Sequence, residues 1–374
     1  MSPTLVQFVE IVTIWFTPCL VALPYVVPDR PHYGRNYPDI FELPEFYDTA
    51  FVGPPIQHDP RWPSTEVTVG QVSGVAVGED GGVLVFHRGN RVWDASTFIG
   101  DKFANARGKG PIQNHTILRL DPATGHVNES FGANKFYLPH GLTVDKQGNI
   151  WVTDVAMHQV MRIPKGRHDP DLVLGEFLVP GNDDKHFCKP TDVAVTSSGE
   201  FFVSDGYCNG RILKYDSNGK LLTQWGQQFT GRASQAGTHG LYIPHSLTLL
   251  EKQDRICVAD REHGRIQCYN AGIKNPATAG QFVKSIEHAE FGKVFAISYD
   301  PKVNLIYAVN GQTYMGNKVK GFTLNMNGDI EGTFEPRGKG FGQPHDIAAS
   351  PNGGDIYVGE IYPDRVTKFS RELW

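Results

Sequence analysis

Three histidines stand in nearly the same phrase of the sequence. His140, His245 and His345 each follow a proline, in LPHGL, IPHSL and QPHDI, and a short apolar run follows each of them. A single Pro-His pair at the start of a strand is usually a local turn feature. Three imidazoles at one register, without a fourth protein ligand, instead describe an open site of the kind that catalytic zinc occupies. The phrases therefore predict a Zn²⁺ centre with one free coordination position.

A repeat in the sequence explains how residues so far apart can meet. From residue 72 onward, a hydrophobic triplet, a turn and a second apolar run recur as GVAVGEDGGVLVFHR, GLTVDKQGNIWVTD, DVAVTSSGEFFVSD, SLTLLEKQDRICVAD, AISYDPKVNLIYAVN and DIAASPNGGDIYVGE. The polar residues that end the second runs are Arg88, Asp154, Asp205, Asp260, Asn310 and Glu360. Their spacing of roughly 50 to 66 residues fits four strands per unit. Third strands are expected at 159–163, 211–215, 265–269 and 365–369. We predict an all-β fold, a six-bladed β-propeller of the NHL-repeat type, over residues 72–374.

The blade geometry places the histidines. Because the first two strands of a blade are antiparallel, the start of the first and the end of the second lie at the same end of the central channel. The three histidines precede the first strands of blades two, four and six, so we expect them about 120° apart around one mouth. In the other blades this register holds Ser73, Thr191 and a residue near Ala296, which cannot complete a ligand cage.

Two arginines and a tyrosine are expected at the same mouth. Arg88 ends the second strand of blade one, Tyr207 follows that of blade three by two residues, and Arg261 directly follows that of blade four. Two guanidiniums beside a metal favour an anionic ligand, and arginine binds carboxylates in a bidentate manner. The alternative for each arginine is a structural ion pair with a neighbouring acid, such as Arg261 with Asp260 or Glu262.

The cysteines and the N-terminus indicate export. Residues 1–27 contain an apolar stretch that we interpret as a signal peptide or an uncleaved anchor, so contact with a membrane is expected only if it is retained. Residues 28–71 form an irregular lead-in that covers one face or helps to close the ring. The blade geometry pairs Cys188 with Cys208, which flank the first two strands of blade three, and Cys257 with Cys268 across a turn.

Other features agree with a secreted protein or one of the secretory-vesicle lumen. Asn114 and Asn128 begin glycosylation sequons. The formal net charge of -5 argues against a nucleic-acid partner, because binding phosphates needs a concentrated basic patch. We expect a monomer that acts on a small or peptidic partner.

With these residues assembled, the chain closely resembles peptidyl-α-hydroxyglycine α-amidating lyase over roughly residues 65–370, through FHRGNRVWD, FYLPHGLTVD, HFCKPTDVAV, VSDGYCNGRI, VADREHGRIQC and PHDIAAS. The resemblance implies a lyase that cleaves a peptide with a C-terminal α-hydroxyglycine into a peptide amide and glyoxylate. Because no copper-binding monooxygenase domain is seen upstream in the sequence, we expect a stand-alone lyase. The resemblance implies zinc bound by the three histidines, and a substrate-binding and catalytic cluster of Arg88, Tyr207 and Arg261. It also implies a structural Ca²⁺ held by the Asp346 side chain and the carbonyls of Val75 and Leu142, since Ca²⁺ prefers oxygen ligands.

The expected chemistry begins with loss of the hydroxyl proton from the substrate. Zinc binds that hydroxyl as a Lewis acid, and Tyr207, with its pKa lowered by Arg88, Arg261 and the metal, acts as the general base. We expect broad tolerance for the peptide upstream of the hydroxyglycine. Two other classes of protein remain open at this stage, a non-catalytic NHL-repeat binding scaffold and a calcium-dependent propeller hydrolase.

Overall fold

The computed structural model describes residues 55–313 and 316–371, so the predicted leader at residues 1–27 lies outside the described residues. The described residues form six four-stranded antiparallel sheets. Blades one to three comprise β2 (Val72–Val77), β3 (Val83–His87), β6 (Ile117–Leu120) and β7 (Val127–Phe131); β8 (Pro139–Val144), β9 (Ile150–Asp154), β10 (Gln159–Ile163) and β11 (Leu172–Leu174); and β12 (Asp192–Val195), β13 (Phe201–Asp205), β14 (Arg211–Tyr215) and β15 (Leu221–Trp225).

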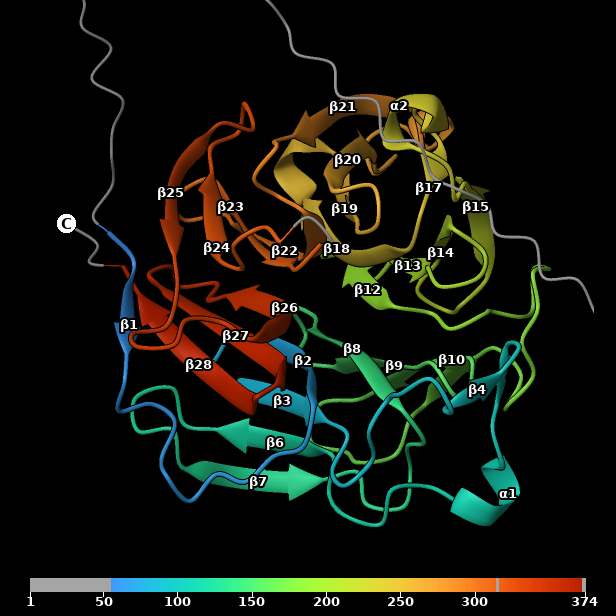
Figure 1. Cartoon of the computed structure of the whole chain (residues 1–374). Coiled ribbons are helices and arrows are strands. Elements are labelled where there is room, and N and C mark those ends of the chain that lie inside the picture. The colour runs from blue at the N-terminus through green and yellow to red at the C-terminus, as the bar shows by residue number, and fades with distance from the viewer. Residues whose placement is uncertain (1–54, 314–315, 372–374) are drawn as a thin grey trace, which may run out of the picture. The chain divides into compact units, whose positions relative to one another are not determined.

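Blades four to six comprise β18 (Pro244–Leu250), β19 (Arg255–Asp260), β20 (Arg265–Asn270) and β21 (Phe282–Glu287); β22 (Lys293–Asp300), β23 (Leu305–Gly311), β24 (Gly321–Leu324) and β25 (Ile330–Phe334); and β26 (Gln343–Ala349), β27 (Asp355–Tyr362), β28 (Asp364–Ser370) and β1 (Gln57–Asp59). The first strand of each blade faces the centre of the ring (Figure 1). The predicted six-bladed β-propeller is confirmed, and the predicted third strands coincide with β10 and β14 and lie within β20 and β28.

Several short strands and helical turns lie in the connections between the blade strands. They are β4 (Phe98–Ile99), β5 (Lys102–Phe103), α1 (Ala106–Lys109), β16 (Gln227–Gln228), α2 (Ala233–Ala236), β17 (Gly240–Leu241), and the 3₁₀ turns η1 (Glu251–Gln253) and η2 (Pro276–Thr278). Within the described ranges no helix is long and apolar enough to cross a membrane. The longest insertion, between β3 and β6 of blade one, carries β4, β5 and α1 and lengthens the first repeat.

The ring closes by pairing the two ends of the described chain. Strand β1 is antiparallel to β28, with Gln57 opposite Ser370 and Asp59 opposite Lys368. Figure 1 shows this N-terminal strand beside the C-terminal sheet. The three residues of β1 lie inside the segment 28–71, which the sequence predicts to be an irregular lead-in. They form the outer strand of blade six.

The core consists of apolar layers between adjacent blades. Leu84 and Phe86 of blade one pack with Val152 and Met161 of blade two, and five similar clusters join the other neighbouring blades within the described residues. Because both faces of each sheet are covered, the inner strands read as continuous apolar runs rather than as alternating ones. This packing fixes the first strands rigidly around the channel.

The register corrects one expectation from the repeat. His87, and not Arg88, occupies the place of the acidic residue, because Val72 pairs with His87 as Pro139 pairs with Asp154. The His87 Nδ1 atom accepts hydrogen bonds from the N–H groups of Gly70 and Gly89, the task that carboxylates perform elsewhere. Burial lowers the pKa of His87 to about 4, which keeps this nitrogen an acceptor. Arg88 is therefore the first residue after β3, just as Arg261 is the first residue after β19.

Both predicted disulfides are present. Cys188 and Cys208 have their Cα atoms 5.4 Å apart, and Cys257 and Cys268 lie 4.1 Å apart as directly opposed residues of β19 and β20. Disulfides persist in oxidising compartments, which supports a secretory or extracellular protein. Glycosylation at Asn114 and Asn128 remains a prediction, and both side chains are exposed.

Candidate metal centre and its surroundings

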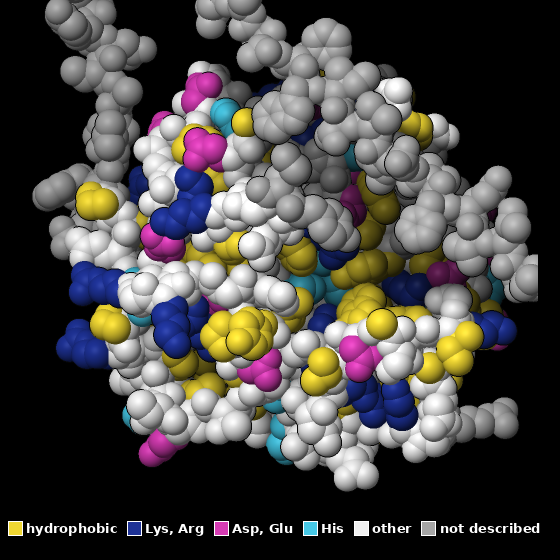
Figure 2. Space-filling model, in the orientation of Figure 1, with side chains coloured by type: hydrophobic (Ala, Val, Ile, Leu, Met, Phe, Trp, Pro, Cys, Tyr) yellow, Lys and Arg dark blue, Asp and Glu magenta, His cyan; other side chains and the backbone are white. Residues whose placement is uncertain are grey.

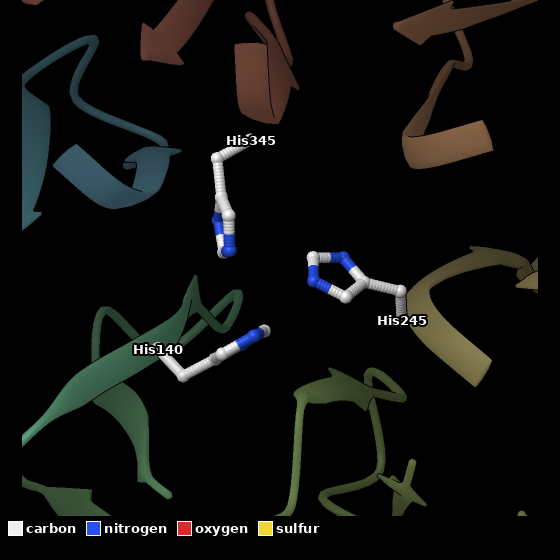
Figure 3. A group of neighbouring side chains, drawn as sticks. All are labelled: His140, His245 and His345. Atoms are coloured by element: carbon white, nitrogen blue, oxygen red, sulfur yellow. The ribbon is translucent and has the colours of Figure 1, made fainter. Parts of the chain in front are cut away.

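The three histidines converge on one point of the channel. His140, His245 and His345 come from the starts of β8, β18 and β26, and each pair of ring centroids is 4.7 Å apart. Figure 3 shows the rings pointing toward one another, and one ligand nitrogen from each lies within 4.8 Å of the other two. The first strands of these blades shift register beside each histidine, and such a bulge re-aims a side chain.

Each imidazole is held by the next blade. The Nδ1 atoms of His140, His245 and His345 lie 2.8 Å from the backbone carbonyls of Thr191, Phe295 and Ser73, respectively. A carbonyl only accepts, so Nδ1–H is the donor and Nε2 keeps its lone pair for a metal. Ser73, Thr191 and Phe295 thus occupy the register of the histidines in the other blades and act through their backbones.

Burial keeps the three imidazoles neutral. All three histidines are almost fully buried, and burial lowers their pKa values well below the usual value, helped by the nearby Arg88, Arg261 and one another. Neutral imidazole is the form that binds metal. Three converging Nε2 lone pairs with oriented Nδ1–H groups fit an open zinc site, in which a fourth position is left for water or substrate.

Tyr207 borders the open side of the histidine cluster. Its Oη atom lies 3.0 Å from Nε2 of His140, 3.2 Å from Nε2 of His245 and 3.4 Å from Nη1 of Arg261. Burial raises the pKa of the phenol, and Arg261 and Arg88 only partly offset this. The two arginines act in the expected direction but are outweighed by burial, so the lowered pKa expected for Tyr207 needs the charge of the metal as well and stays a prediction.

Arg88 is a buried cation with a free donor. Its side chain is 1% exposed, Nε donates to the Pro139 carbonyl at 3.0 Å, and Nη1 donates to Oε1 of Gln71 at 2.8 Å. Among residues 55–313 and 316–371 the Nη2 atom has no hydrogen-bond partner. Burial lowers the pKa of this guanidinium to about 10, so it stays charged at neutral pH. A buried, unpaired N–H donor of this kind fits an anionic ligand.

Arg261 differs from Arg88 because it already has an acidic partner. Its guanidinium contacts Glu262 at 2.9 Å, and Glu262 also binds Nζ of Lys293 at 2.8 Å. The structural ion pair that the sequence left open is therefore present for this arginine. Its guanidinium also lies over the rings of Tyr207 and Phe295, 5.3 and 4.9 Å from their centroids. Arg261 is thus held beside the Tyr207 hydroxyl.

Two carboxylates, the buried Asp192 and the partly buried Asp346, lie deeper in the channel. Asp346 and Asp192, together with the three histidines, line a cavity of about 10 Å³, and both carboxylates also line a larger cavity of about 190 Å³ between the first strands. The Asp346 carboxylate accepts the Val75 N–H at 2.8 Å, and Leu142 lines the same channel. Burial raises the pKa of both carboxyls, and Asp192 raises that of Asp346 further.

Three residues at the site were not predicted from the sequence. Gln71 bridges Arg88 and the backbone N–H of Trp93, and the Trp93 ring packs 4.8 Å from that of Tyr207. Asp192 is the first residue of β12. It directly follows Thr191, as Asp346 directly follows His345. The repeat contains an acid at that register in blade three. Trp93 lies inside the FHRGNRVWD motif but received no role there, and Gln71 belongs to no motif.

Comparison with known proteins decides the family. The chain is 49% identical over 320 residues to peptidyl-glycine alpha-amidating monooxygenase B of Xenopus laevis, with 84% of this chain and 35% of that protein covered. It is 41% identical over 303 residues to peptidyl-alpha-hydroxyglycine alpha-amidating lyase 2 of Drosophila melanogaster, with 80% and 71% covered. The chain belongs to the peptidyl-α-hydroxyglycine α-amidating lyase family.

This amidating lyase chain spans about a third of the length of the monooxygenases that it matches. The NHL repeat family matches residues 136–162, 187–215 and 241–269, which cover most of the first three strands of blades two, three and four. Kuenenia stuttgartiensis hydrazine synthase has a similar fold, with a TM-score of 0.52 and 11% identity over 83% of this chain and 80% of that one. That likeness concerns the fold alone.

Proposed function

We propose that this amidating lyase family member is a zinc-dependent enzyme that cleaves a peptidyl-α-hydroxyglycine into a peptide amide and glyoxylate. The observation that carries the proposal is the convergence of three neutral Nε2 atoms beside the free Nη2 donor of Arg88. The substrate presents a hydroxyl and a carboxylate on the same carbon atom. The site offers a metal-binding position for the first group and a buried cation for the second.

Each residue of the site has a separate role in the proposed reaction. Arg88 Nη2 would bind the substrate carboxylate and so fix the carbon atom that bears the hydroxyl. Held by the three Nε2 atoms, Zn²⁺ would supply a Lewis acid for that hydroxyl and a positive charge beside Tyr207 Oη. Tyr207 would accept the hydroxyl proton, and Arg261 would stabilise the phenolate. The carbon–nitrogen bond then breaks, the hydroxyl carbon becomes the aldehyde of glyoxylate, and the amide nitrogen takes up a proton.

We also propose a structural Ca²⁺ in the channel, held by the Asp346 side chain and the carbonyls of Val75 and Leu142. In the described residues no lysine, arginine or histidine forms an ion pair with the buried carboxylate of Asp192 or the partly buried one of Asp346. A divalent cation would offset the cost of burying them as charges, which the raised pKa values express. Oxygen ligands of this kind suit Ca²⁺.

We place the enzyme outside the cell or in the secretory-vesicle lumen, and we propose that it acts as a monomer. Two disulfides support the oxidising compartment. The pairing of β1 with β28 closes the ring within one chain, and all three histidines come from that chain. The site therefore needs no residue from a second copy.

The function is tested by incubating the purified protein with a synthetic peptide that ends in α-hydroxyglycine. We expect stoichiometric glyoxylate and peptide amide, with bound zinc found by elemental analysis. Removal of zinc with a chelator should abolish turnover, and added Zn²⁺ should restore it. Full activity in metal-depleted protein would overturn the zinc requirement, and absence of glyoxylate from the zinc-loaded protein would overturn the lyase activity.

Exchange of Arg88 for glutamine removes the charge but keeps much of the side-chain volume. Because a hydrogen bond to a charged group contributes about 1.5–3 kcal/mol, we expect the KM for the hydroxyglycine peptide to rise roughly 10- to 100-fold, with a smaller effect on kcat. The measurement compares this substrate with one whose carboxylate is replaced by a carboxamide.

The variant should discriminate little between the two substrates, whereas the unaltered enzyme should prefer the carboxylate. The control is Arg162→Gln, because Arg162 pairs with Asp171 in the outer part of blade two. An Arg88→Gln enzyme that keeps the carboxylate preference would remove Arg88 from substrate binding.

A further inference from the structure

A chain of aromatic rings leads away from the histidine cluster. It begins where Trp93 meets Tyr207, at a centroid distance of 4.8 Å. From Trp93 the successive ring distances are 5.3, 6.0, 6.1 and 5.4 Å. We call these rings the aromatic strip: Trp93, Phe98, Phe103, Tyr137 and Phe177. The strip connects the insertion of blade one with the segment between blades two and three.

The strip combines one buried ring with partly and fully exposed apolar side chains. Phe103 is 6% exposed, Trp93, Phe98 and Tyr137 are partly buried, and Phe177 at the outer end is 46% exposed. Val92 and Ile99, next to Trp93 and Phe98 in the sequence, are 58% and 76% exposed. Figure 2 shows histidine side chains in the hollow at the centre of this face, with hydrophobic side chains beside them. Exposed apolar and aromatic side chains next to a polar pocket are typical of a binding site.

The inner end of the strip adjoins Arg88, which we propose binds the substrate carboxylate. The Arg88 guanidinium lies over the Trp93 ring, 5.2 Å from its centroid. A carboxylate bound at Arg88 Nη2 therefore lies beside the indole ring. The peptide begins one bond from the carbon that bears this carboxylate, so its last side chains before the hydroxyglycine lie near Trp93.

We propose that the aromatic strip is a subsite for the residues that precede the hydroxyglycine, and that it selects apolar or aromatic side chains there. This inference rests on the proposed function and narrows the expected tolerance for the upstream peptide. An extended peptide advances roughly 3.3–3.6 Å per residue, so each gap of about 5–6 Å between neighbouring rings corresponds to about one and a half to two residues.

Cations near the strip disfavour basic peptides. Lys109 Nζ lies 5.3 Å from the centroid of Phe103, and Lys189 Nζ lies 4.6 Å from that of Phe98, where Asp101 also pairs with it at 2.9 Å. A lysine or arginine side chain on the strip would meet the like charge of Lys109 and, to a smaller degree, that of Lys189. Neutral apolar side chains meet no such repulsion and gain the contact with the rings.

The test compares four substrates: N-acetyl-α-hydroxyglycine, and its forms extended by Ser-Ser, Phe-Phe or Lys-Lys before the hydroxyglycine. We expect kcat/KM for the Phe-Phe substrate to exceed that for Ser-Ser about tenfold, and Lys-Lys to fall below Ser-Ser. Phe177→Ser and Ile99→Ser should each reduce the Phe-Phe advantage about three- to fivefold. The same variants should leave N-acetyl-α-hydroxyglycine unaffected. The control is Phe282→Ser, because Phe282 is 38% exposed on the outer strand of blade four.

The outcomes separate this inference from the proposed function. If N-acetyl-α-hydroxyglycine releases glyoxylate but all extended substrates react equally, the strip is not a substrate subsite. The inference is likewise overturned if Phe177→Ser alters the oligomeric state in solution but not the substrate preference, because the strip would then be an interface between copies. Absence of glyoxylate from every substrate would contradict the lyase activity itself.

Discussion

Replacement of His345 by alanine is expected to abolish zinc binding and to lower kcat/KM at least about 1,000-fold. The variant loses one of three ligands, and a metal that stabilises developing charge contributes several kcal/mol to the transition state. The measurement is zinc content after dialysis, together with glyoxylate release. Since burial lowers the pKa of all three imidazoles well below the usual value, the unaltered enzyme should keep its zinc somewhat below pH 6.5.

A matched histidine variant separates this effect from a general loss of structure. His126→Ala removes an exposed imidazole near the start of β7 and should leave zinc and turnover unchanged. The thermal midpoints of both variants, measured after chelation, show whether either one is misfolded. A His345→Ala protein that retains stoichiometric zinc and activity would refute the proposed ligand set.

Exchange of Tyr207 for phenylalanine is expected to reduce kcat about 100- to 10,000-fold while zinc remains bound. The change deletes one oxygen atom, which lies 3.0 and 3.2 Å from Nε2 of His140 and His245. Positioned proton transfer contributes about that much to catalysis. Zinc content and single-turnover glyoxylate release measure the two effects separately.

The control for this variant removes a tyrosine hydroxyl at the end of a blade away from the histidines. Tyr299 lies near the end of β22, where its hydroxyl donates to Asn304, so Tyr299→Phe should be nearly silent. Near-normal turnover of Tyr207→Phe with zinc in place would exclude Tyr207 as the proton acceptor. A loss of zinc together with activity would indicate instead that the phenol helps to hold the metal.

The fold was predictable because each blade repeats the same physical solution. A buried inner strand, a tight turn and a second buried strand leave the same apolar pattern in every copy, so the count and order of the blades follow from the repeat. The convergence of the three histidines needed only their common register. The disulfides followed in the same way, because each pair brackets a known turn or strand pair.

Features that depend on contacts between distant segments were not predictable. The insertion of blade one brings Trp93 against Tyr207, and although the repeat places Tyr207 at the mouth, no periodic pattern places Trp93. Glu262 was one of two acids open to Arg261, and only side-chain packing decides between them. The place of Arg88 was misjudged by one residue because His87 is itself polar and takes over the role of a carboxylate.

The hydrogen bond between His345 Nδ1 and the Ser73 carbonyl joins residues 272 positions apart in the chain. The last of the three proposed zinc ligands thus gains its orientation only after blade six has docked against blade one. A chain that is still being synthesised, or one whose final blade has come loose, has at most two oriented imidazoles. Zinc uptake should therefore be among the last events of maturation, and the enzyme should gain activity only once the whole toroid is assembled.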